Sequence, residues 1–315
     1  MVSLVTGGAG FIGSSLVDFL MDRGEAVHVI DNLSSGDLSN IEKWAKHPDF
    51  SFYQGDLLNP DDILQALKGC ETVYHLAANP EVRSSKASPR DHFDQNILAT
   101  YNLQEAIRLS GEVESIIFAS TSTVYGEPSV IPTPESYGPM KPISHYGASK
   151  LASEALISSY ASMYGFRCIL FRLANVIGGR SNHGVIYDFV QKLRADPRRL
   201  EVLGDGSQSK SYLFIDDCVS GMVFEAGNSS DQISVFNLGS DDRVDVLSIA
   251  DIVIDEMGLE QVDVALTGGV DGGRGWKGDV KLMQLDTSKL RGMGWIMEYG
   301  SSEAVRLTAR EICRG

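Results

Sequence analysis

The chain has 315 residues, of which 43% are apolar and 22% charged, a composition typical of folded globular proteins. Its 42 acidic residues outnumber its 27 Lys and Arg residues, and the net charge of −15 argues against nucleic acid or an anionic membrane as a partner. No apolar run approaches the ~20 residues of a membrane span, and Met1 leads directly into a strand-like segment. We therefore expect a cytoplasmic protein without a signal peptide.

Apolar, strand-like segments alternate with helical patterns in the first half of the chain. Parallel strands covered on both faces are nearly continuous in apolar residues, and six segments fit this description: 2–5, 26–30, 50–53, 72–76, 115–119 and 168–173. Helical patterns begin near Phe11, Ser39, Pro60, Pro89 and Gly147. The alternation predicts an α/β fold with a Rossmann-type, doubly wound parallel sheet over residues 1–175.

The rhythm changes after residue 175, where glycine-rich turns separate shorter elements. We expect residues 176–315 to form a smaller C-terminal α/β lobe, with a segment near 211–237 returning to the sheet. The cysteines, at 70, 168, 218 and 313, include no CxxC pair, which favours reduced packing residues over the alternative, a redox role. Since no group of His, Cys, Asp and Glu has metal-ligand spacing, we expect no metal site.

A glycine pattern marks the end of the first expected strand. Gly7, Gly10 and Gly13 form GxxGxxG, and a helix begins at Phe11. Such a turn lets the backbone approach a pyrophosphate, and the helix N-terminus supplies free N–H groups. The second strand ends at Asp31, whose carboxylate would accept hydrogen bonds from ribose hydroxyls and repel a 2′-phosphate. The pattern favours NAD over NADP; the alternative is a structural turn with a capping Asp.

Further candidates for the cofactor site lie where the third and fourth expected strands end. Asp56 follows the third strand, and Leu76, Ala77 and Ala78 close the fourth. In an open α/β sheet, ligands lie along this edge, so these positions favour cofactor contacts. The alternatives are that Asp56 caps a helix and that the two alanines serve tight packing.

Two segments carry the expected chemistry. Thr121 lies at the end of the fifth strand, and Tyr146 and Lys150 open a helix with a spacing of four that places both on one face. An ammonium beside a phenol favours the phenolate, which lowers the Tyr pKa and suits a general base. The alternative for Tyr146 and Lys150 is an exposed i,i+4 pair.

Together with the segments 31–36, 75–78, 171–175 and 203–206, these motifs resemble the NAD-dependent epimerase/dehydratase family of extended short-chain dehydrogenases/reductases over essentially the whole chain. The resemblance implies a tightly held NAD that is regenerated in each cycle. It also implies a set of further cofactor-binding residues: Phe11, Ile12, Asn32, Ser34, Ser35, Gly36, Leu57, Asn96, Tyr146, Lys150 and Leu173.

The residues after Thr121 separate the branches of this family. Its dehydratases carry Asp and Glu directly after the threonine, and its decarboxylases carry Glu at the second of these positions, whereas this chain has Ser122 and Thr123. Neither side chain can replace a carboxyl group in proton transfer. The resemblance therefore implies 4-epimerisation of a UDP-hexose, between UDP-glucose and UDP-galactose. Alternatives are a UDP-N-acetylhexosamine or a UDP-uronate as substrate, and a catalytically silent NAD-binding regulator.

The family mechanism assigns a role to each reacting residue. Tyr146, as phenolate, takes the proton of the sugar C4 hydroxyl while the C4 hydride moves to NAD, and the resulting 4-keto sugar turns over before the hydride returns to the opposite face. Lys150 holds the nicotinamide ribose and stabilises the phenolate. Thr121 hydrogen-bonds to the C4 oxygen.

The resemblance also implies residues that hold the UDP part, and assembly as a homodimer through helices at about 91–109 and 147–164. By position, UDP is expected at Asn175, Val185, Lys210 and Arg274. Lys210 stands where relatives often carry Arg, and the spacing from Arg274 to Gly278–Asp279 differs from some relatives, so a solvated surface role remains the alternative for both. Pro80 replaces a cofactor-contacting Lys of some epimerases, and Arg83 is a candidate to supply that charge.

Overall fold

The computed structural model describes residues 1–81, 88–228 and 231–314. A seven-stranded sheet dominates it, in the order β11-β6-β5-β4-β1-β2-β3. The central pairs β1–β2, β2–β3, β1–β4 and β4–β5 are all parallel. The strands are β1 Val2–Thr6, β2 Ala26–Asp31, β3 Phe50–Gln54, β4 Thr72–His75, β5 Ser115–Thr121, β6 Arg167–Leu173 and β11 Ile233–Leu238. The Rossmann-type prediction is confirmed, and all six expected strands are present.

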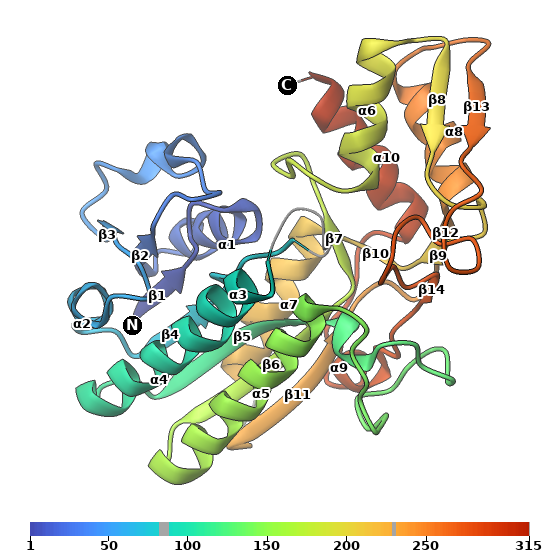
Figure 1. Ribbon diagram of the computed structural model, residues 1–315. Coiled ribbons are helices and arrows are strands. Elements are labelled where there is room, and N and C mark those ends of the chain that lie inside the picture. Colours follow the sequence, from blue (N-terminus) through green and yellow to red (C-terminus); the bar gives the residue numbers. More distant parts are fainter. Residues whose placement is uncertain (82–87, 229–230, 315) are drawn as a thin grey trace. The chain divides into compact units, whose positions relative to one another are not determined.

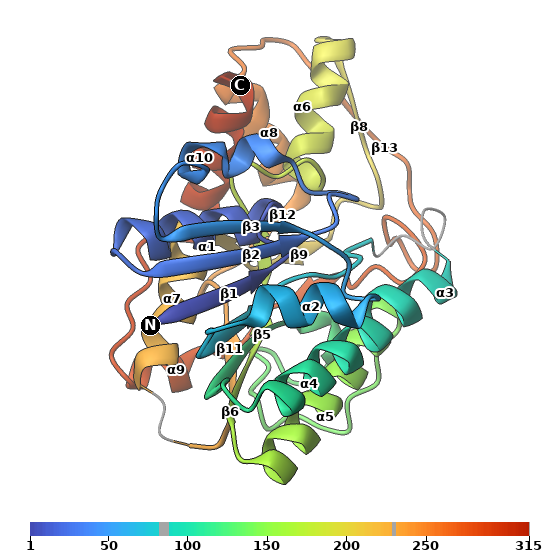
Figure 2. The ribbon, with the colours of Figure 1, turned by 90° about the vertical axis from the view of Figure 1, so that its left-hand side faces the viewer.

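Strand order reverses direction between β1 and β4, which makes the carboxyl ends of these strands the topological switch point where such sheets bind ligands. Helices α2, α4 and α5 cover one face of the sheet, and α1 and α7 the other (Figures 1 and 2). Their bounds are α1 Phe11–Asp22, α2 Pro60–Leu67, α3 Pro89–His92, α4 Ala99–Ser110, α5 His145–Tyr164 and α7 Ile215–Asn228. A π-helical turn, Phe93–Leu98, joins α3 to α4, and short 3-10 turns occupy Leu38–Asn40, Glu42–Trp44 and Ser122–Tyr125.

One expected helix is absent in its predicted form. The pattern that begins near Ser39 forms only two 3-10 turns, and Asp37 caps the first by accepting from the Ser39 N–H. Helix α2 begins as predicted at Pro60, after Asn59 as its N-cap. Proline suits this first position because its missing N–H would have no partner there.

The chain divides into two compact units. The first comprises residues 1–124, 141–172 and 219–236, and the second comprises 125–140, 173–218 and 237–315. The core of the first unit lies between the sheet and its helices, with Leu4, Val73, Leu103, Ile116 and Ile157 fully buried. This close-packed core holds in place the strand ends that carry the candidate site.

The second unit is built from small sheets and helices. Strand β7 Asn175–Ile177 pairs with β10 Tyr212–Phe214, and β8 Arg199–Val202 pairs with β13 Asp263–Leu266, both in parallel. A third sheet joins β12 Val244–Asp245, β9 Ser209–Lys210 and β14 Leu282–Met283. The helices are α6 Val185–Ala195, α8 Val246–Glu256, α9 Ser288–Gly292 and α10 Ser301–Arg314, and α10 packs on α6, α8 and β10.

All four cysteines are free thiols, and three of them are buried. Within the described ranges, no three His, Cys, Asp or Glu side chains are grouped so that they could hold a metal ion. Of the helices in those ranges, none has both the length and the apolar character needed to cross a bilayer.

Candidate active site

The glycine pattern forms a tight turn at the end of β1. Gly7 has φ +70°, and a Cβ there would lie 2.8 Å from the Ala77 backbone nitrogen. A Cβ on Gly13 would lie 2.1 Å from the Gly7 carbonyl oxygen. Since no side chain fits at these two positions, the backbone of the turn stays bare beside the first turn of α1. This glycine cradle is the form that a pyrophosphate-binding turn requires.

Asp31 ends β2 beside the glycine turn and is buried. One carboxylate oxygen accepts from the Ala9 N–H at 2.9 Å and the other from the Leu33 N–H at 2.8 Å. A Cβ on Gly36 would lie 3.0 Å from the Asp31 carboxylate, so Gly36 leaves room around it. Asp31 thus organises the turn, and each of its oxygens retains a lone pair for a ribose hydroxyl.

Asn32 and Asp56 bring the ends of β2 and β3 together. The Asn32 amide donates to Asp56 at 2.9 Å, and the Leu58 N–H donates to the other Asp56 oxygen at 2.8 Å. The interpretation of Asp56 as a helix cap is wrong, because Asn59 caps α2. Among the other predicted cofactor residues near this edge, Ser34 and Ser35 are exposed and Leu57 is buried.

The end of β4 is tied to the end of β1 through Thr6. Its hydroxyl accepts from the N–H groups of Leu76 and Ala77, each at 3.2 Å, and also contacts His75 Nδ1 at 2.9 Å. His75 Nε2 reaches the Thr100 hydroxyl at 3.0 Å, and burial lowers the pKa of this histidine to about 3. His75 is therefore a neutral packing residue, and Leu76, Ala77 and the adjacent Ala78 lie directly after the last paired residues of β1 and β4.

Asn96 lies in the π-helical turn before α4 and is almost completely buried. Its amide oxygen accepts from the Asn79 N–H at 2.7 Å, and its amide nitrogen donates to Ser149 at 2.8 Å. The side chain thus joins the loop after β4 to the first turns of α5. Pi-helical turns are frequent at functional sites, and this one places Asn96 against the helix that carries Tyr146 and Lys150.

Helix α5 presents the predicted reacting residues. It begins beyond Ser144, which caps it by accepting from the Gly147 N–H at 3.0 Å, so Tyr146 lies in the first turn. The Thr121 side chain lies near enough to the Tyr146 phenol to lower its pKa. Lys150, one turn further along, donates to the Ala119 carbonyl at 2.8 Å and lies 4.6 Å from the centre of the Phe118 ring. The exposed i,i+4 pair is thereby excluded, because Lys150 is only 3% exposed.

The protonation equilibria of these two groups differ from the prediction. Burial raises the pKa of Tyr146 to about 12, opposed by the nearby Thr121 side chain. Burial also lowers the pKa of Lys150 to about 7. The prediction that Lys150 lowers the Tyr146 pKa is wrong for the protein alone, since desolvation of the phenolate outweighs any help from an ammonium that is itself weakly protonated.

Sequence reasoning missed Glu154, Arg172 and His92 near this helix. Glu154 follows Lys150 by one turn and forms a buried ion pair with Arg172 at 2.8 Å. The ring of His92 lies 6.3 Å from that of Tyr146. The four-residue spacing of Tyr146, Lys150 and Glu154 was the available signal for Glu154, whereas nothing in the local sequence marks His92.

The residues expected to hold UDP belong to the second unit. Arg83, the candidate for the missing positive charge near the cofactor, lies outside the described residues. Lys210 forms an ion pair with Asp279 at 2.6 Å, and its ammonium lies 5.4 Å from the Trp276 ring centre. Arg274 donates to the Asp279 carbonyl at 2.5 Å and to the Asp271 carbonyl at 3.2 Å, and forms an ion pair with Glu127.

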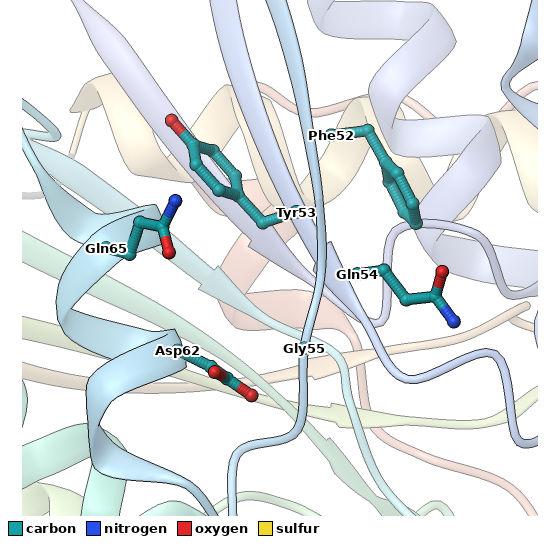
Figure 3. A pocket seen from close by; sticks show the side chains of 6 residues that line it. All are labelled: Phe52, Tyr53, Gln54, Gly55, Asp62 and Gln65. Atoms are coloured by element: carbon teal, nitrogen blue, oxygen red, sulfur yellow. The ribbon is translucent and has the colours of Figure 1, made fainter.

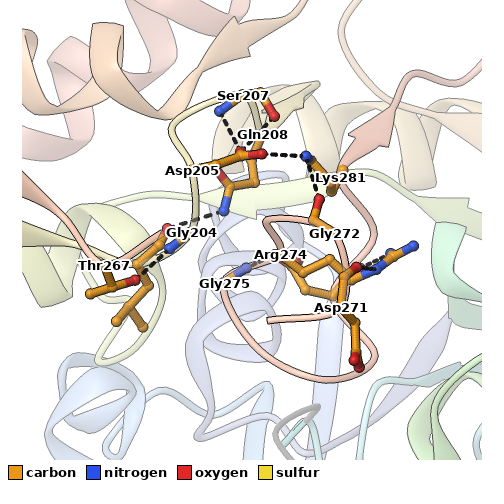
Figure 4. Close-up of polar contacts among 12 residues, drawn as sticks. Gly204, Asp205, Ser207, Gln208, Thr267, Asp271, Gly272, Arg274, Gly275 and Lys281 are labelled. Carbon is orange, nitrogen blue, oxygen red and sulfur yellow. Dashed lines mark hydrogen bonds and ion pairs between the residues drawn. The ribbon is translucent and has the colours of Figure 1, made fainter. Parts of the chain in front are cut away.

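Lys210 and Arg274 therefore meet at Asp279, which itself is buried. Figure 4 shows the glycine-rich loop around Arg274, fastened on its other side by Lys281, which contacts Asp205 at 2.8 Å and the Gly272 carbonyl at 2.9 Å. The solvated alternative fails, because the side chains of Lys210 and Arg274 are only 17% and 18% exposed. Asn175 donates to the Ser211 carbonyl at 3.1 Å, Val185 opens α6, and Leu173 is buried at the end of β6.

A separate pocket of about 220 Å³ lies beside β3 and α2 (Figure 3). Its lining is mostly polar and consists of Phe52, Tyr53, Gln54, Gly55, Asp62 and Gln65. None of the predicted site residues lines it, so this pocket does not mark the candidate active site.

Comparison with known proteins adds independent information. A model of the NAD-dependent epimerase/dehydratase family matches residues 3–239. A putative UDP-glucose 4-epimerase from Methanocaldococcus jannaschii is 32% identical over 309 residues, covering 96% of this chain and 95% of the relative. A crystal structure of a UDP-galactose 4-epimerase is 42% identical, with a TM-score of 0.87 over 100% of this chain and 99% of its own.

A second solved relative is a UDP-glucuronic acid 4-epimerase from Bacillus cereus, in complex with UDP-glucuronic acid and NAD. It is 28% identical to this chain, with a TM-score of 0.88 over 100% of this chain and 99% of its own.

Proposed function

Because the chain belongs to the NAD-dependent epimerase/dehydratase family, we propose that it interconverts UDP-glucose and UDP-galactose by inversion at C4 of the sugar. The observation that carries the proposal is that α5 carries Tyr146 and Lys150 one turn apart, and that Lys150 donates at 2.8 Å to the Ala119 carbonyl, two residues before Thr121 at the end of β5. Ser122 and Thr123, which follow Thr121, supply no carboxyl group for the elimination of water or of carbon dioxide. The reacting residues are therefore suited only to removing and returning one proton and one hydride.

The cofactor of this family is NAD, and the first unit fits it. The glycine cradle at Gly7 and Gly13 suits the pyrophosphate, and the buried carboxylate of Asp31 suits an adenosine ribose without a 2′-phosphate. When bound, NAD supplies the acceptor and donor of the C4 hydride. In the proposal, Asn32, Ser34, Ser35 and Gly36, together with Asp56, Leu57, Leu76 to Ala78, Asn96 and Leu173, complete the cofactor site.

Tyr146 and Thr121 handle the proton in the proposed reaction. Tyr146 is the general base toward the C4 hydroxyl, and Thr121 hydrogen-bonds to the same oxygen and holds the phenol in line. Since burial raises the Tyr146 pKa to about 12, ionisation of the phenol depends on nearby positive charge. Lys150 supplies part of that charge from the same helix face and orients the nicotinamide ribose.

Lys210, Arg274, Asn175 and Val185 form the proposed UDP site in the second unit. Two cations that share Asp279 suit a diphosphate, because each phosphate group needs local positive charge in a chain of net charge −15. Glu127 forms an ion pair with Arg274, so the diphosphate must replace this carboxylate in order to bind the guanidinium. Glu127 is half exposed and can turn toward solvent.

A UDP-uronate or a UDP-N-acetylhexosamine is the second candidate substrate. The similarity to a UDP-glucuronic acid 4-epimerase supports it, since the proposed chemistry takes place at C4 and is independent of the groups on C2 and C6 of the sugar. A silent NAD-binding regulator is disfavoured because both Tyr146 and Lys150 are present, one turn apart on α5.

We further propose a cytoplasmic homodimer. Both predicted dimer helices, α4 and α5, carry large apolar side chains at the surface: Tyr101 and Leu109 on α4, and Met163 and Tyr164 on α5. Such surface is suited to burial against a second copy. The four free thiols suit a reducing compartment.

The first test is conversion of UDP-galactose by the purified protein with no NAD added, followed by NMR of UDP-glucose. We expect conversion, because NAD stays bound through the cycle. A protein that stays inactive after NAD is supplied would exclude this substrate pair. The same assay with UDP-glucuronate and UDP-N-acetylglucosamine ranks the alternatives, and a tenfold preference for either in kcat/KM would replace the UDP-glucose assignment.

A further inference from the structure

Glu154, a buried carboxylate, lies on α5 one turn beyond the reacting residues Tyr146 and Lys150. Tyr146, Lys150 and Glu154 follow one another at intervals of four residues, which places all three on one helix face. Glu154 is only 4% exposed. A carboxylate is costly to bury, so its position calls for an account of what it does.

Glu154 holds two strands of the sheet. The Ser120 hydroxyl, on β5, donates to it at 2.5 Å. The Arg172 guanidinium, on β6, donates through Nε at 3.1 Å and through a terminal nitrogen at 2.8 Å. These bonds compensate the burial of both charges and fix α5 relative to the ends of two strands.

Ser120 connects this ion pair to the reacting groups. It stands between Ala119, whose carbonyl accepts from Lys150 at 2.8 Å, and Thr121, whose side chain lies near the Tyr146 phenol. A change at Ser120 therefore moves the acceptor of Lys150 and the partner of Tyr146 together. Glu154 fixes Ser120 from the same helix that carries both reacting residues.

Glu154 also influences the charge of Lys150. In the described part of the chain, the direct partners of the ammonium are a carbonyl and the Phe118 ring, and no ion pair reaches it. Burial lowers the pKa of Lys150, and the negative charge of Glu154 opposes that effect. The other titratable or charged groups around this pair are Arg172 on β6, Tyr146 on α5 and His75 on β4, which is neutral.

We propose that Glu154 is a positioning residue for the active site, which favours the charged form of Lys150 from the same helix face and, through Ser120, holds the Ala119 carbonyl and Thr121 in place. The catalytic consequence rests on the proposed function. The effect on the charge of Lys150 does not, so the two can fail separately.

The test is an NMR titration of protein carrying ¹³C-labelled lysine, with the Lys150 signal assigned through Lys150→Met. In Glu154→Gln we expect Lys150 to titrate about one unit lower than in wild type, and kcat at pH 7 to fall about tenfold with little change in KM. Glu256→Gln is the matched control, because Glu256 is likewise an arginine-paired carboxylate, held by Arg306 and Arg310 in the second unit. It should leave the titration and kcat unchanged.

Two more variants separate charge from geometry. Ser120→Ala keeps the ion pair, so Lys150 should titrate as in wild type while kcat falls severalfold. If Glu154→Gln does not fold, because Arg172 loses its carboxylate partner, Glu154→Met/Arg172→Met removes both charges and should fold with about tenfold lower kcat. An unshifted Lys150 titration in Glu154→Gln, or wild-type kcat in Ser120→Ala or in the folded double variant, would overturn the proposal. If wild type epimerises no UDP-sugar, the proposed function fails, and the titration still decides the role of Glu154.

Discussion

The first unit and the second unit treat their functional cations in opposite ways. In the first, Lys150 donates to a carbonyl and faces a ring, and burial lowers its pKa to about 7. In the second, Lys210 and Arg274 are already neutralised by the carboxylates of Asp279 and Glu127. A proton-transfer site needs a cation whose charge responds to its surroundings, whereas an anion-binding site needs cations that are always charged and held in place.

The largest expected effect lies at the reacting phenol. Tyr146→Phe removes the hydroxyl that exchanges the proton and leaves the ring packed beside His92. We expect kcat for UDP-galactose to fall by ~10² or more, since general acid–base catalysis contributes at least that much. NMR of the product measures the rate, and unchanged unfolding in urea controls for the fold. A variant with wild-type kcat would remove Tyr146 from the mechanism.

The next effect concerns the second unit. Arg274→Gln removes a cation from the proposed diphosphate site, and we expect KM for UDP-galactose to rise about tenfold with kcat nearly constant, since hydrogen bonds to charged groups contribute about 1.5–3 kcal/mol. Lys281→Gln is a control on the same loop, because Lys281 fastens Asp205 and Gly272. A KM that rises equally in both variants would point to loop geometry instead of a direct contact.

A stability measurement sharpens the contrast between Lys150 and the paired cations. Because the Lys150 pKa falls from 10.5 to about 7 on folding, the unfolded chain binds more protons between these values, and this residue's contribution favours folding increasingly as pH rises through that window. Lys150→Met lacks this contribution. Between pH 7 and 8.5, the free energy of unfolding of wild type should therefore gain about 1–2 kcal/mol on that of the variant. Urea unfolding of both proteins at both pH values checks this. A difference in free energy of unfolding that stays the same at pH 7 and 8.5 would contradict it.

The smallest expected effect concerns the ion pair between Arg274 and Glu127. Glu127→Gln weakens the contact that the diphosphate must replace, and the side chain is 52% exposed, so the ion pair itself contributes little to stability. We expect KM for UDP-galactose to fall about threefold, corresponding to the 0.2–1 kcal/mol of an exposed pair. Wild-type or weaker affinity would mean that Glu127 does not compete with the substrate.

Much of the first unit could be predicted from sequence because its signals are local. Buried parallel strands are continuous apolar runs, the glycine turn follows one of them, and the spacing of Tyr146 and Lys150 reports a shared helix face. The helix expected at Ser39 was wrong, because this segment forms only two short 3-10 turns, the first of which is capped by Asp37.

The contacts that set charge states could not be predicted, because they join distant parts of the chain. The pairing of Glu154 with Arg172 depends on how α5 packs on β6, and that of Arg274 with Glu127 links positions 147 residues apart. The same limit explains the error about Tyr146. The sequence places an ammonium near the phenol, but the burial that raises its pKa depends on tertiary packing.

The central claim is that a proton and a hydride leave C4 and return to it within one site. UDP-galactose carrying deuterium at C4 tests this most directly, with the purified protein in ordinary water and the UDP-glucose product analysed by NMR and mass spectrometry. The account predicts that the product keeps its deuterium at C4, because the hydride never exchanges with solvent. Product that has lost the deuterium to water would contradict the proposed chemistry.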